Sequence, residues 1–290
     1  MSNIYWDKIR ILVTNRCNYA CSFCHNEGQN KIASSSKMTL SSLKLLIDYI
    51  GDQGVSEICF SGGEPFINSD LIAMILYVEC NTNCDISCAS NFSLITEKHF
   101  ELLKGSRIKF NIQFPYANRH DFHMSSGCGK YEVVLANIKK AKTLGIGIGL
   151  NSVIQNSDIL KLKELIYFAV KNELPLKLLP QIGLKDSFLF KKTIYPILKE
   201  HAIDFIDKGT GATRWTIRLG NHTSTVLYID SPCFSKDITS CKRYGEIRVH
   251  PNLDIQPCIQ KSPVAMLQLN MGKRFVIEQF RESWRNLSQC

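Results

Sequence analysis

Short runs of β-branched and apolar residues alternate with helical segments through residue 180, and this alternation constrains the fold more than any other feature. The predicted strands cover residues 9–14, 55–60, 84–90, 107–112, 145–154 and 174–179. The predicted helices between them cover residues 39–53, 69–79, 96–104, 131–144 and 158–172. Successive strand and helix units predict a parallel sheet with right-handed crossovers, because parallel strands need a long connection. We therefore expect an α/β fold, a partial (β/α)6 TIM-type barrel, with functional groups at the carboxyl ends of its strands.

The pattern changes in the last third of the chain. The predicted elements there are a helix at 188–207, two strands around a turn at 213–230, a hairpin at 245–258 that turns at Pro251 and Asn252, and a closing helix at 273–287. Short strands joined by turns are typical of a small α+β unit. We therefore divide the chain into a barrel domain, residues 1–210, and a small carboxyl-terminal module, residues 211–290.

The composition excludes several classes of protein. With 290 residues and 44% hydrophobic content, the chain can bury a full core. The amino-terminal residues lack an apolar signal segment, and no apolar run is long enough to span a membrane, so we expect a cytoplasmic protein without a membrane partner. The net charge of +9 is spread over scattered basic pairs and does not predict nucleic-acid binding.

The chain carries 12 cysteines, which in a reducing compartment predict metal or redox sites where they cluster. Cys17, Cys21 and Cys24 follow the first predicted strand directly, in the stretch RCNYACSFCHNEG. Their spacing places three sulfur atoms on one tight loop, which suits an iron-sulfur cubane whose fourth iron stays open for another chelator. The alternatives are a structural zinc site that recruits His25 and a loop of thiols without a metal.

A second motif, CFSGGEP at residues 59–65, lies at the end of the second predicted strand. Gly62 and Gly63 expose backbone there, and the Glu64 carboxylate can accept a hydrogen bond from a ligand ammonium. Together with the cysteine loop, this motif resembles the radical S-adenosylmethionine (SAM) superfamily. The predicted barrel matches the fold of that superfamily.

The resemblance implies a catalytic 4Fe-4S cluster on Cys17, Cys21 and Cys24. It also implies that Gly62, Gly63 and Glu64, all within the second motif, hold the methionine end of SAM. Reductive cleavage of SAM would then give a 5'-deoxyadenosyl radical that takes hydrogen from an unreactive carbon. The cofactor supplies the difficult chemistry, and the protein supplies position and exclusion of water.

Further contacts with SAM follow from the resemblance. Ser90 and Asn91 end the third predicted strand, where relatives place a threonine or serine and an asparagine near SAM. Gln113 ends the fourth strand, where relatives often carry a serine that contacts the ribose. Asn151 matches a position close to SAM or substrate, and its alternative role is an amide hydrogen-bonded within the protein.

Within the superfamily, residues 8–180 resemble the GTP cyclase family that begins molybdenum-cofactor biosynthesis. The resemblance rests on IRILVTNRCNYACSFCHNEG and GIGLNSVIQNSDILKLKELIYFA. Arg10 matches an arginine that helps bind the nucleotide in that family, and its alternative role is a structural ion pair. The triphosphate site is depleted, because residues 66–69 read FINS in place of basic residues and Gly149 replaces a lysine. The chain also ends in NLSQC, without the glycine and arginine tail of that family.

The predicted carboxyl-terminal module contains Cys233, Cys241 and Cys258. The stretch CKRYGEIRVHPNLDIQPC, residues 241–258, resembles the cysteine hairpin of the twitch and SPASM auxiliary-cluster domains, which implies a second iron-sulfur cluster. Three ligands leave an open iron for substrate, whereas Cys290 would close the cluster as a fourth ligand. We favour three ligands because chain ends are usually mobile. A zinc site is the alternative.

Other conspicuous residues are assigned to packing or to solvent. Cys84 and Cys88 lie on one face of a predicted strand, too far apart along an extended chain to share a cluster. Residues 118–130, from NRHDFH to SSGCGK, are predicted as a solvated loop after the fourth strand. Cys128 on this loop is assigned to packing, although it could reach the barrel mouth.

Three classes of function are compatible with these patterns. We favour a radical SAM enzyme that cyclises, rearranges or oxidises a small polar, nucleotide-like substrate and receives electrons from a reductant such as flavodoxin or ferredoxin. The alternative is a maturase that crosslinks or epimerises a ribosomally made peptide, against which we count the lack of a leader-binding segment before the first strand. A scaffold that has lost SAM chemistry is disfavoured by the two intact motifs.

Overall fold

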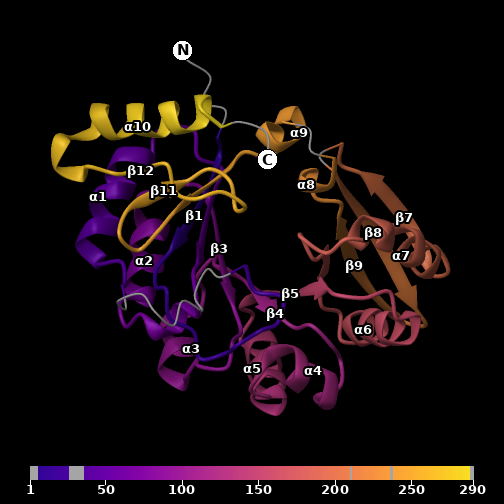
Figure 1. The fold of residues 1–290 in the computed structure, drawn as a ribbon. Coiled ribbons are helices and arrows are strands. Elements are labelled where there is room, and N and C mark those ends of the chain that lie inside the picture. Colours follow the sequence, from indigo (N-terminus) through magenta and orange to yellow (C-terminus); the bar gives the residue numbers. More distant parts are fainter. Residues whose placement is uncertain (1–5, 26–35, 210, 236–237, 288–290) are drawn as a thin grey trace.

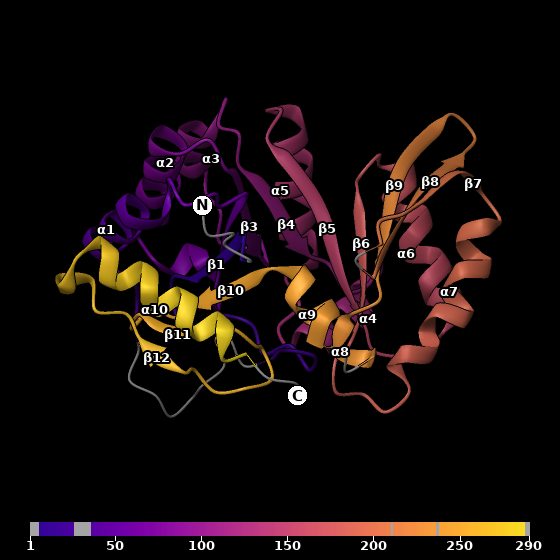
Figure 2. The same ribbon diagram turned by 90° about the horizontal axis from the view of Figure 1, so that it is seen from above.

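Six parallel strands form the centre of the structure, a computed structural model that describes residues 6–25, 36–209, 211–235 and 238–287. Their spatial order is their sequence order: β1 (Lys8–Leu12), β2 (Glu57–Ser61), β3 (Asp85–Ser90), β4 (Lys109–Gln113), β5 (Gly147–Ile154) and β6 (Leu176–Pro180). The sheet curves but does not close into a ring (Figure 2). The predicted α/β fold with a partial barrel is therefore confirmed.

Helices connect these strands and cover the outer side of the sheet (Figure 1). They are α1 (Leu40–Ile50), α2 (Leu71–Asn81), α3 (Glu97–Leu103), α5 (Tyr131–Thr143) and α6 (Ile159–Lys171). Side-chain caps fix where some of them begin: Thr39 accepts a hydrogen bond from the Ser42 N–H, and Asp158 accepts one from the Leu160 N–H. Within the described residues, no helix combines the length and the hydropathy that crossing a membrane requires.

Strands from the last third of the chain extend both edges of this sheet. They are β7 (Ala202–Asp207), β8 (Ala212–Leu219), β9 (His222–Ile229), β10 (Glu246–Val249), β11 (Asp254–Gln256) and β12 (Ala265–Met266). β9 pairs in parallel with β6, and β10 pairs in parallel with β1, so the described part of the chain forms one 12-stranded sheet. The boundary at residue 210 stays a prediction, and backbone pairing continues across it from β7 to β8.

The predicted helix at residues 188–207 is wrong in its second half. A helix, α7 (Phe190–Lys199), ends eight residues early, and the rest of the predicted range contains the edge strand β7. The segment AIDFID carries apolar residues at spacings that fit either a helix or a strand. Antiparallel pairing with β8 makes this segment a strand, and such pairing cannot be read from local periodicity.

The predicted loop at residues 118–130 contains a helix, α4 (Arg119–Ser126). The side chain of Asn118 caps its first turn by accepting a hydrogen bond from the Asp121 N–H at 2.9 Å. Gly127 ends the helix in the left-handed conformation at φ 74°, with its N–H bonded to the His123 carbonyl. Start and stop signals were therefore present in this short polar stretch.

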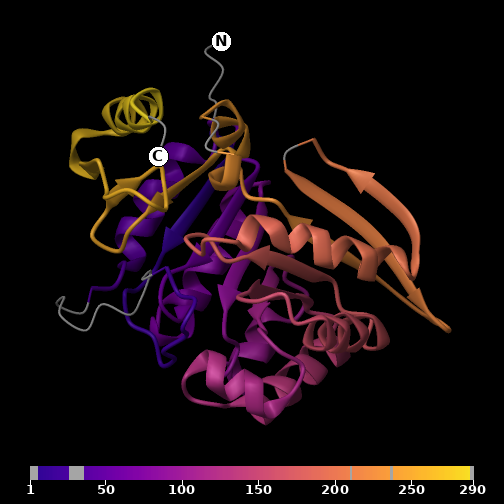
Figure 3. The same cartoon turned by 45° about the vertical axis from the view of Figure 1, so that its right-hand side comes forward.

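The two ends of the described chain share one core. The carboxyl-terminal helix α10 (Lys273–Arg285) packs against α1, beside β10 to β12 (Figure 3). Phe280 of this helix stacks on Trp6 with ring centroids 4.8 Å apart, and both side chains are buried. The helix predicted at residues 273–287 therefore covers the β1 edge of the sheet.

Candidate active site at the open end of the barrel

A cavity of about 340 Å³ lies where the barrel strands end. The residues that line it from β2 to β6 are Ser61, Gly62, Ala89, Gln113, Asn151, Val153, Leu179 and Pro180. Arg10 of β1 and Cys24 of the cysteine loop also line it. The last third of the chain adds, among others, Cys233, Cys241, Glu246, Arg248 and Cys258. The cavity thus brings together residues of both predicted cysteine sets.

The three cysteines of the opening motif lie on the loop after β1 and are half-buried. The Tyr19 N–H donates a hydrogen bond to the Cys17 sulfur at 3.3 Å, and the Cys24 N–H donates to the Cys21 carbonyl at 3.2 Å. The loop therefore turns tightly around its sulfur atoms.

The electrostatics of this loop fit an iron-sulfur cluster. Burial raises the pKa of Cys17 to about 11 and that of Cys21 to about 12, and neighbouring cysteines add to both shifts. Thiols in such a place stay protonated until a positive charge replaces the proton. Cluster iron supplies that charge, and cysteine thiolates are its usual ligands.

The glycines of the second motif lie against the start of the cysteine loop. A Cβ atom on Gly62, whose φ is 122°, would lie 2.3 Å from the Thr14 carbonyl oxygen, and one on Gly63 would lie 2.0 Å from the Arg16 carbonyl oxygen. The Gly63 N–H donates to the Thr14 carbonyl at 2.9 Å, and the Glu64 N–H donates to the Arg16 carbonyl at 2.8 Å. Only glycine fits this close backbone approach.

The Glu64 carboxylate is fully buried and bonds within the protein. It accepts hydrogen bonds from the Ser90 hydroxyl and the Asn91 N–H, both at 2.7 Å, and from the Phe66 N–H at 3.2 Å. Burial raises its pKa to about 7, and the three donors oppose that shift. Its side chain therefore joins β2 to β3, and its predicted contact with a ligand ammonium stays a prediction. Ser61 and Gly62 are the residues of this motif that line the cavity.

Asn91 is hydrogen-bonded to the cysteine loop. Its side-chain N–H donates to the Asn18 side-chain oxygen at 2.8 Å, and the Asn18 amide donates to the Ser93 hydroxyl at 3.0 Å. Neither Ser90 nor Asn91 is among the residues that line the cavity. Sequence reasoning missed Asn18, although its place between Cys17 and Cys21 was a signal for a loop-holding residue.

Gln113 and Asn151 are neighbours in the register of β4 and β5, and both line the cavity. The Gln113 Nε2 donor and the Asn151 Oδ1 acceptor are buried without a hydrogen-bond partner among the described residues. Buried polar atoms without partners are costly, so a ligand with hydroxyl groups would gain both bonds. This pair fits the predicted contacts with SAM.

An ion triad crosses the β1 and β10 strands beside the cavity. Arg10 donates to both carboxylate oxygens of Glu246, at 3.1 and 2.9 Å, and Arg248 donates to the same carboxylate at 2.6 Å. Burial alone would raise the pKa of Glu246, but the two guanidinium groups lower it to about 2. Arg10 therefore forms the ion pair that was its alternative role. Glu246 and Arg248 were missed because their strand was assigned to a separate module.

The second cysteine set converges on the cavity from three segments. Cys233 lies in α8 (Pro232–Ser235), Cys241 in α9 (Ile238–Tyr244) and Cys258 just after β11. Within the described residues, no three His, Cys, Asp or Glu side chains are close enough to hold a single metal ion. The second cluster stays a prediction. Cys290 lies outside the described residues.

Comparison with known proteins identifies the family. The family model described as the radical SAM superfamily matches residues 11–161 of the 290-residue chain. The chain therefore belongs to the radical SAM superfamily, a class of enzymes. Membership implies a 4Fe-4S cluster and SAM as cofactors.

Two relatives with known or probable GTP cyclase names are similar to this chain in sequence. The GTP 3',8-cyclase of Clostridium perfringens is 24% identical over 291 residues, which cover 95% of this chain and 87% of that protein. A probable GTP 3',8-cyclase of Sulfurisphaera tokodaii is 27% identical over 204 residues, 68% of this chain. The matched region spans 64% of that relative's own length.

Solved structures share the fold at low sequence identity. SuiB of Streptococcus suis bound to S-adenosylmethionine gives a TM-score of 0.69 at 15% identity, over 90% of this chain and 63% of that chain. The anSMEcpe structure with bound AdoMet gives a TM-score of 0.67 at 12% identity, over 95% of this chain and 77% of that chain. At these identities the likeness establishes the fold alone.

Proposed function

We propose that the protein reductively cleaves SAM at a 4Fe-4S cluster on Cys17, Cys21 and Cys24. The resulting 5'-deoxyadenosyl radical takes a hydrogen atom from a substrate in the 340 Å³ cavity. The single observation that carries this proposal is that the cavity is lined by Cys24 together with the unpaired amide atoms of Gln113 and Asn151.

The residues of this chain bind and orient SAM rather than act as acids or bases. The Gly62 backbone lies beside the cysteine loop and lines the cavity, where it is placed for the methionine end of SAM. Gln113 donates to, and Asn151 accepts from, hydroxyl groups of the ligand. Glu64, Ser90 and Asn91 are hydrogen-bonded to one another, Glu64 and Asn91 also bond to the cysteine loop, and their contacts with SAM remain part of the proposal.

The charge beside the cavity favours a small polar substrate over a triphosphate. Arg10 and Arg248 carry two positive charges, and Glu246 cancels one of them through direct hydrogen bonds. A polyanion would have to replace these short ion pairs, and truncating or breaking a buried pair is costly. We therefore propose a substrate that carries less negative charge than GTP.

A peptide substrate is the second candidate, and exposed apolar side chains favour it. Leu184, Phe188 and Leu189 are 37%, 52% and 37% exposed, on the segment that follows β6 and the cavity residue Ile182. A peptide could bury these side chains while one of its residues enters the cavity. SuiB has also been solved with its precursor peptide SuiA, with a TM-score of 0.63 to this chain.

A second cluster on Cys233, Cys241 and Cys258 completes the proposal. These cysteines line the same cavity as Cys24, so the second cluster would face the substrate. Electrons would come from a reductant such as flavodoxin or ferredoxin.

Iron and sulfide quantitation under anaerobic conditions tests the proposal, together with electron paramagnetic resonance (EPR) and an assay for 5'-deoxyadenosine. We expect about eight irons per chain, falling to about four in the Cys17/Cys21/Cys24 triple alanine variant. Cys80→Ala, at an exposed thiol outside the cavity, is the control. Four irons falling to none would rule out the second cluster. No 5'-deoxyadenosine from dithionite-reduced wild-type protein would overturn the proposed reaction.

A further inference from the structure

The end of α4 covers the outer side of the cysteine loop. The Ala20 N–H donates to the Ser126 carbonyl, and the Ser22 N–H donates to the Ser125 carbonyl, both at 3.1 Å. A Cβ atom on Gly127 would lie 2.9 Å from the Ala20 carbonyl oxygen, so the two backbones pack closely. The cysteine loop is therefore packed against two segments: the glycine motif that follows β2, and the end of α4, which follows β4.

The side chain of Gln155 joins the end of α4 to the cysteine loop. Gln155, directly after β5, donates from Nε2 to the Ser22 hydroxyl at 3.0 Å. Its Oε1 accepts a hydrogen bond from the buried Ser125 hydroxyl at 3.0 Å. A single planar amide thus holds Ser22, which lies between Cys21 and Cys24, and the end of α4 at the same time.

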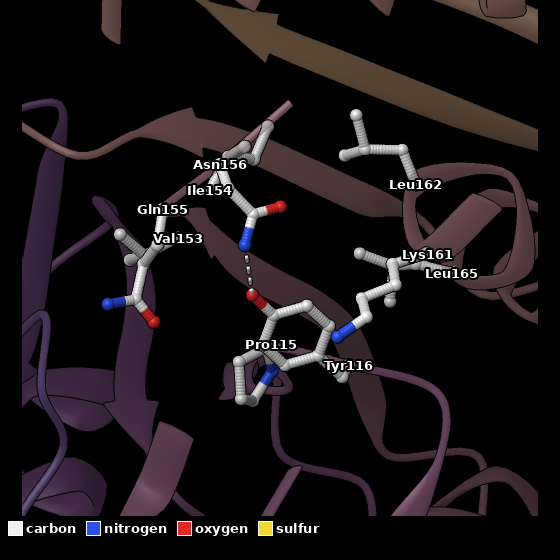
Figure 4. A pocket seen from close by; sticks show the side chains of 9 residues that line it. All are labelled: Pro115, Tyr116, Val153, Ile154, Gln155, Asn156, Lys161, Leu162 and Leu165. Carbon is white, nitrogen blue, oxygen red and sulfur yellow. Dashed lines mark hydrogen bonds between the residues drawn. The ribbon is translucent and has the colours of Figure 1, made fainter. Parts of the chain in front are cut away.

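The position of Gln155 on β5 connects the loop to the cavity. Alternate residues of an extended strand share a face, so Asn151, Val153 and Gln155 follow one another on one side. Asn151 and Val153 line the cavity, and Gln155 reaches the cysteine loop just beyond them. The next residue points elsewhere: in Figure 4 the Asn156 amide lies against Tyr116, whereas the Gln155 amide points away from that ring.

We propose that Gln155 is a positioning residue that sets the distance between the cysteine loop and the β5 wall of the cavity. The proposal rests on the proposed function, in which the cluster on the loop and SAM beside Asn151 must meet in one geometry. Rates of such reactions are sensitive to placement, and a shift of about 1 Å can cost roughly 100-fold. Loss of the Gln155 amide frees the Ser22 hydroxyl, leaves the loop held there by the Ser22 backbone alone, and lets the cluster move relative to SAM without removing any cluster ligand.

Three variants test this role: Gln155→Ala, Gln155→Glu and the neighbouring control Asn156→Ala. Glutamate loses the Nε2 donor but keeps the oxygen that accepts from the Ser125 hydroxyl at 3.0 Å and from the Ser22 hydroxyl at 3.3 Å, so Gln155→Glu should keep most of the function. The readouts are iron per chain, the EPR spectrum of the reduced protein with and without SAM, and 5'-deoxyadenosine formed per iron. We expect Gln155→Ala to keep its iron, to lose the SAM-dependent change in the spectrum and to slow cleavage by about 10- to 100-fold. Asn156→Ala should match wild type.

A further variant removes the same hydrogen bond from the side of the cysteine loop. Ser22→Ala removes the partner of Gln155, so it should reproduce the Gln155→Ala spectrum, and the double variant should add little, as expected for two residues in one interaction. An unchanged spectrum and rate in both single variants, with wild type active, would overturn the positioning role alone. A wild-type protein without cluster or cleavage would instead overturn the proposed function.

Discussion

At the scale of single residues, the two buried carboxylates of the site have opposite electrostatics. Glu64 accepts hydrogen bonds only from neutral donors, and burial raises its pKa to about 7. Glu246 is equally buried, but Arg10 and Arg248 lower its pKa to about 2. The charge of the hydrogen-bond donors, and not the degree of burial, therefore decides which of the two carboxylates stays ionised at every physiological pH.

The ion triad should make the protein acid-sensitive. The pKa of Glu246 is about 2 in the folded state, below its ordinary value of 4.5, so its contribution to stability is complete above pH 4.5 and is lost as the pH falls toward 2. The shift corresponds to roughly 3 kcal/mol. We expect Glu246→Gln to lower the free energy of unfolding by about that amount at pH 7, and the difference from wild type to shrink toward pH 2. Urea unfolding across this pH range measures it.

Glu278→Gln is the matched control, because Glu278 pairs with Arg285 on the exposed surface of α10. Its unfolding curves should follow wild type at each pH. If Glu246→Gln also follows wild type at pH 7, the triad does not stabilise the fold.

At the scale of elements, the turn after β2 and the loop after β1 form one unit. Gly62 and Gly63 let the two backbones touch, and Glu64 fastens the turn to the end of β3. The cysteine loop thus takes its shape from neighbouring strand ends as well as from its own hydrogen bonds. A change in the turn should therefore act on the cluster.

Gly63→Ala should remove most of the bound iron. The new Cβ would lie 2.0 Å from the Arg16 carbonyl oxygen, a backbone atom, so the cysteine loop must move. Gly149→Ala is the control, since its Cβ would lie 3.3 Å from the Pro175 carbonyl oxygen on a strand away from the loop. Iron content after anaerobic reconstitution measures the effect. Wild-type iron content in Gly63→Ala would show that the loop does not depend on this contact.

At the scale of the whole molecule, the last third of the chain extends both edges of the open barrel sheet. β10 pairs with β1 and supplies Glu246 and Arg248 to the site, while β9 pairs with β6 at the other edge. α10 then packs its buried face on α1 and on Trp6. The site and the core therefore depend on residues from both ends of the chain.

Phe280→Ala should destabilise the whole protein by about 3 to 5 kcal/mol, because it removes a fully buried ring that stacks on Trp6. Phe275→Ala on the same helix should cost about 0.5 kcal/mol or less, since that ring is 41% exposed. Thermal unfolding followed by circular dichroism should show one lower transition for Phe280→Ala. Two separate transitions would instead mean that the carboxyl-terminal helix unfolds independently of the barrel.

Local patterns in the sequence were enough for the barrel strands and for both motifs. Strand β5 (Gly147–Ile154) and helix α6 (Ile159–Lys171) follow the predicted ranges closely, because apolar periodicity is a property of neighbouring residues. The same local information left β7 ambiguous, since AIDFID fits two periods. It also missed α4, because a short polar helix has little periodicity to detect.

The sequence by itself determined which residues could ligate a cluster and where along the chain the six barrel strands lie. Only the tertiary structure decided that Arg10 meets Glu246, 236 positions away, and that the Glu64 carboxylate accepts hydrogen bonds from the end of β3. It also decided that Gln155 reaches Ser22, 133 positions away. The physical reason is that periodicity and motif spacing are short-range properties, whereas these contacts depend on which strand ends the curved, open sheet brings together.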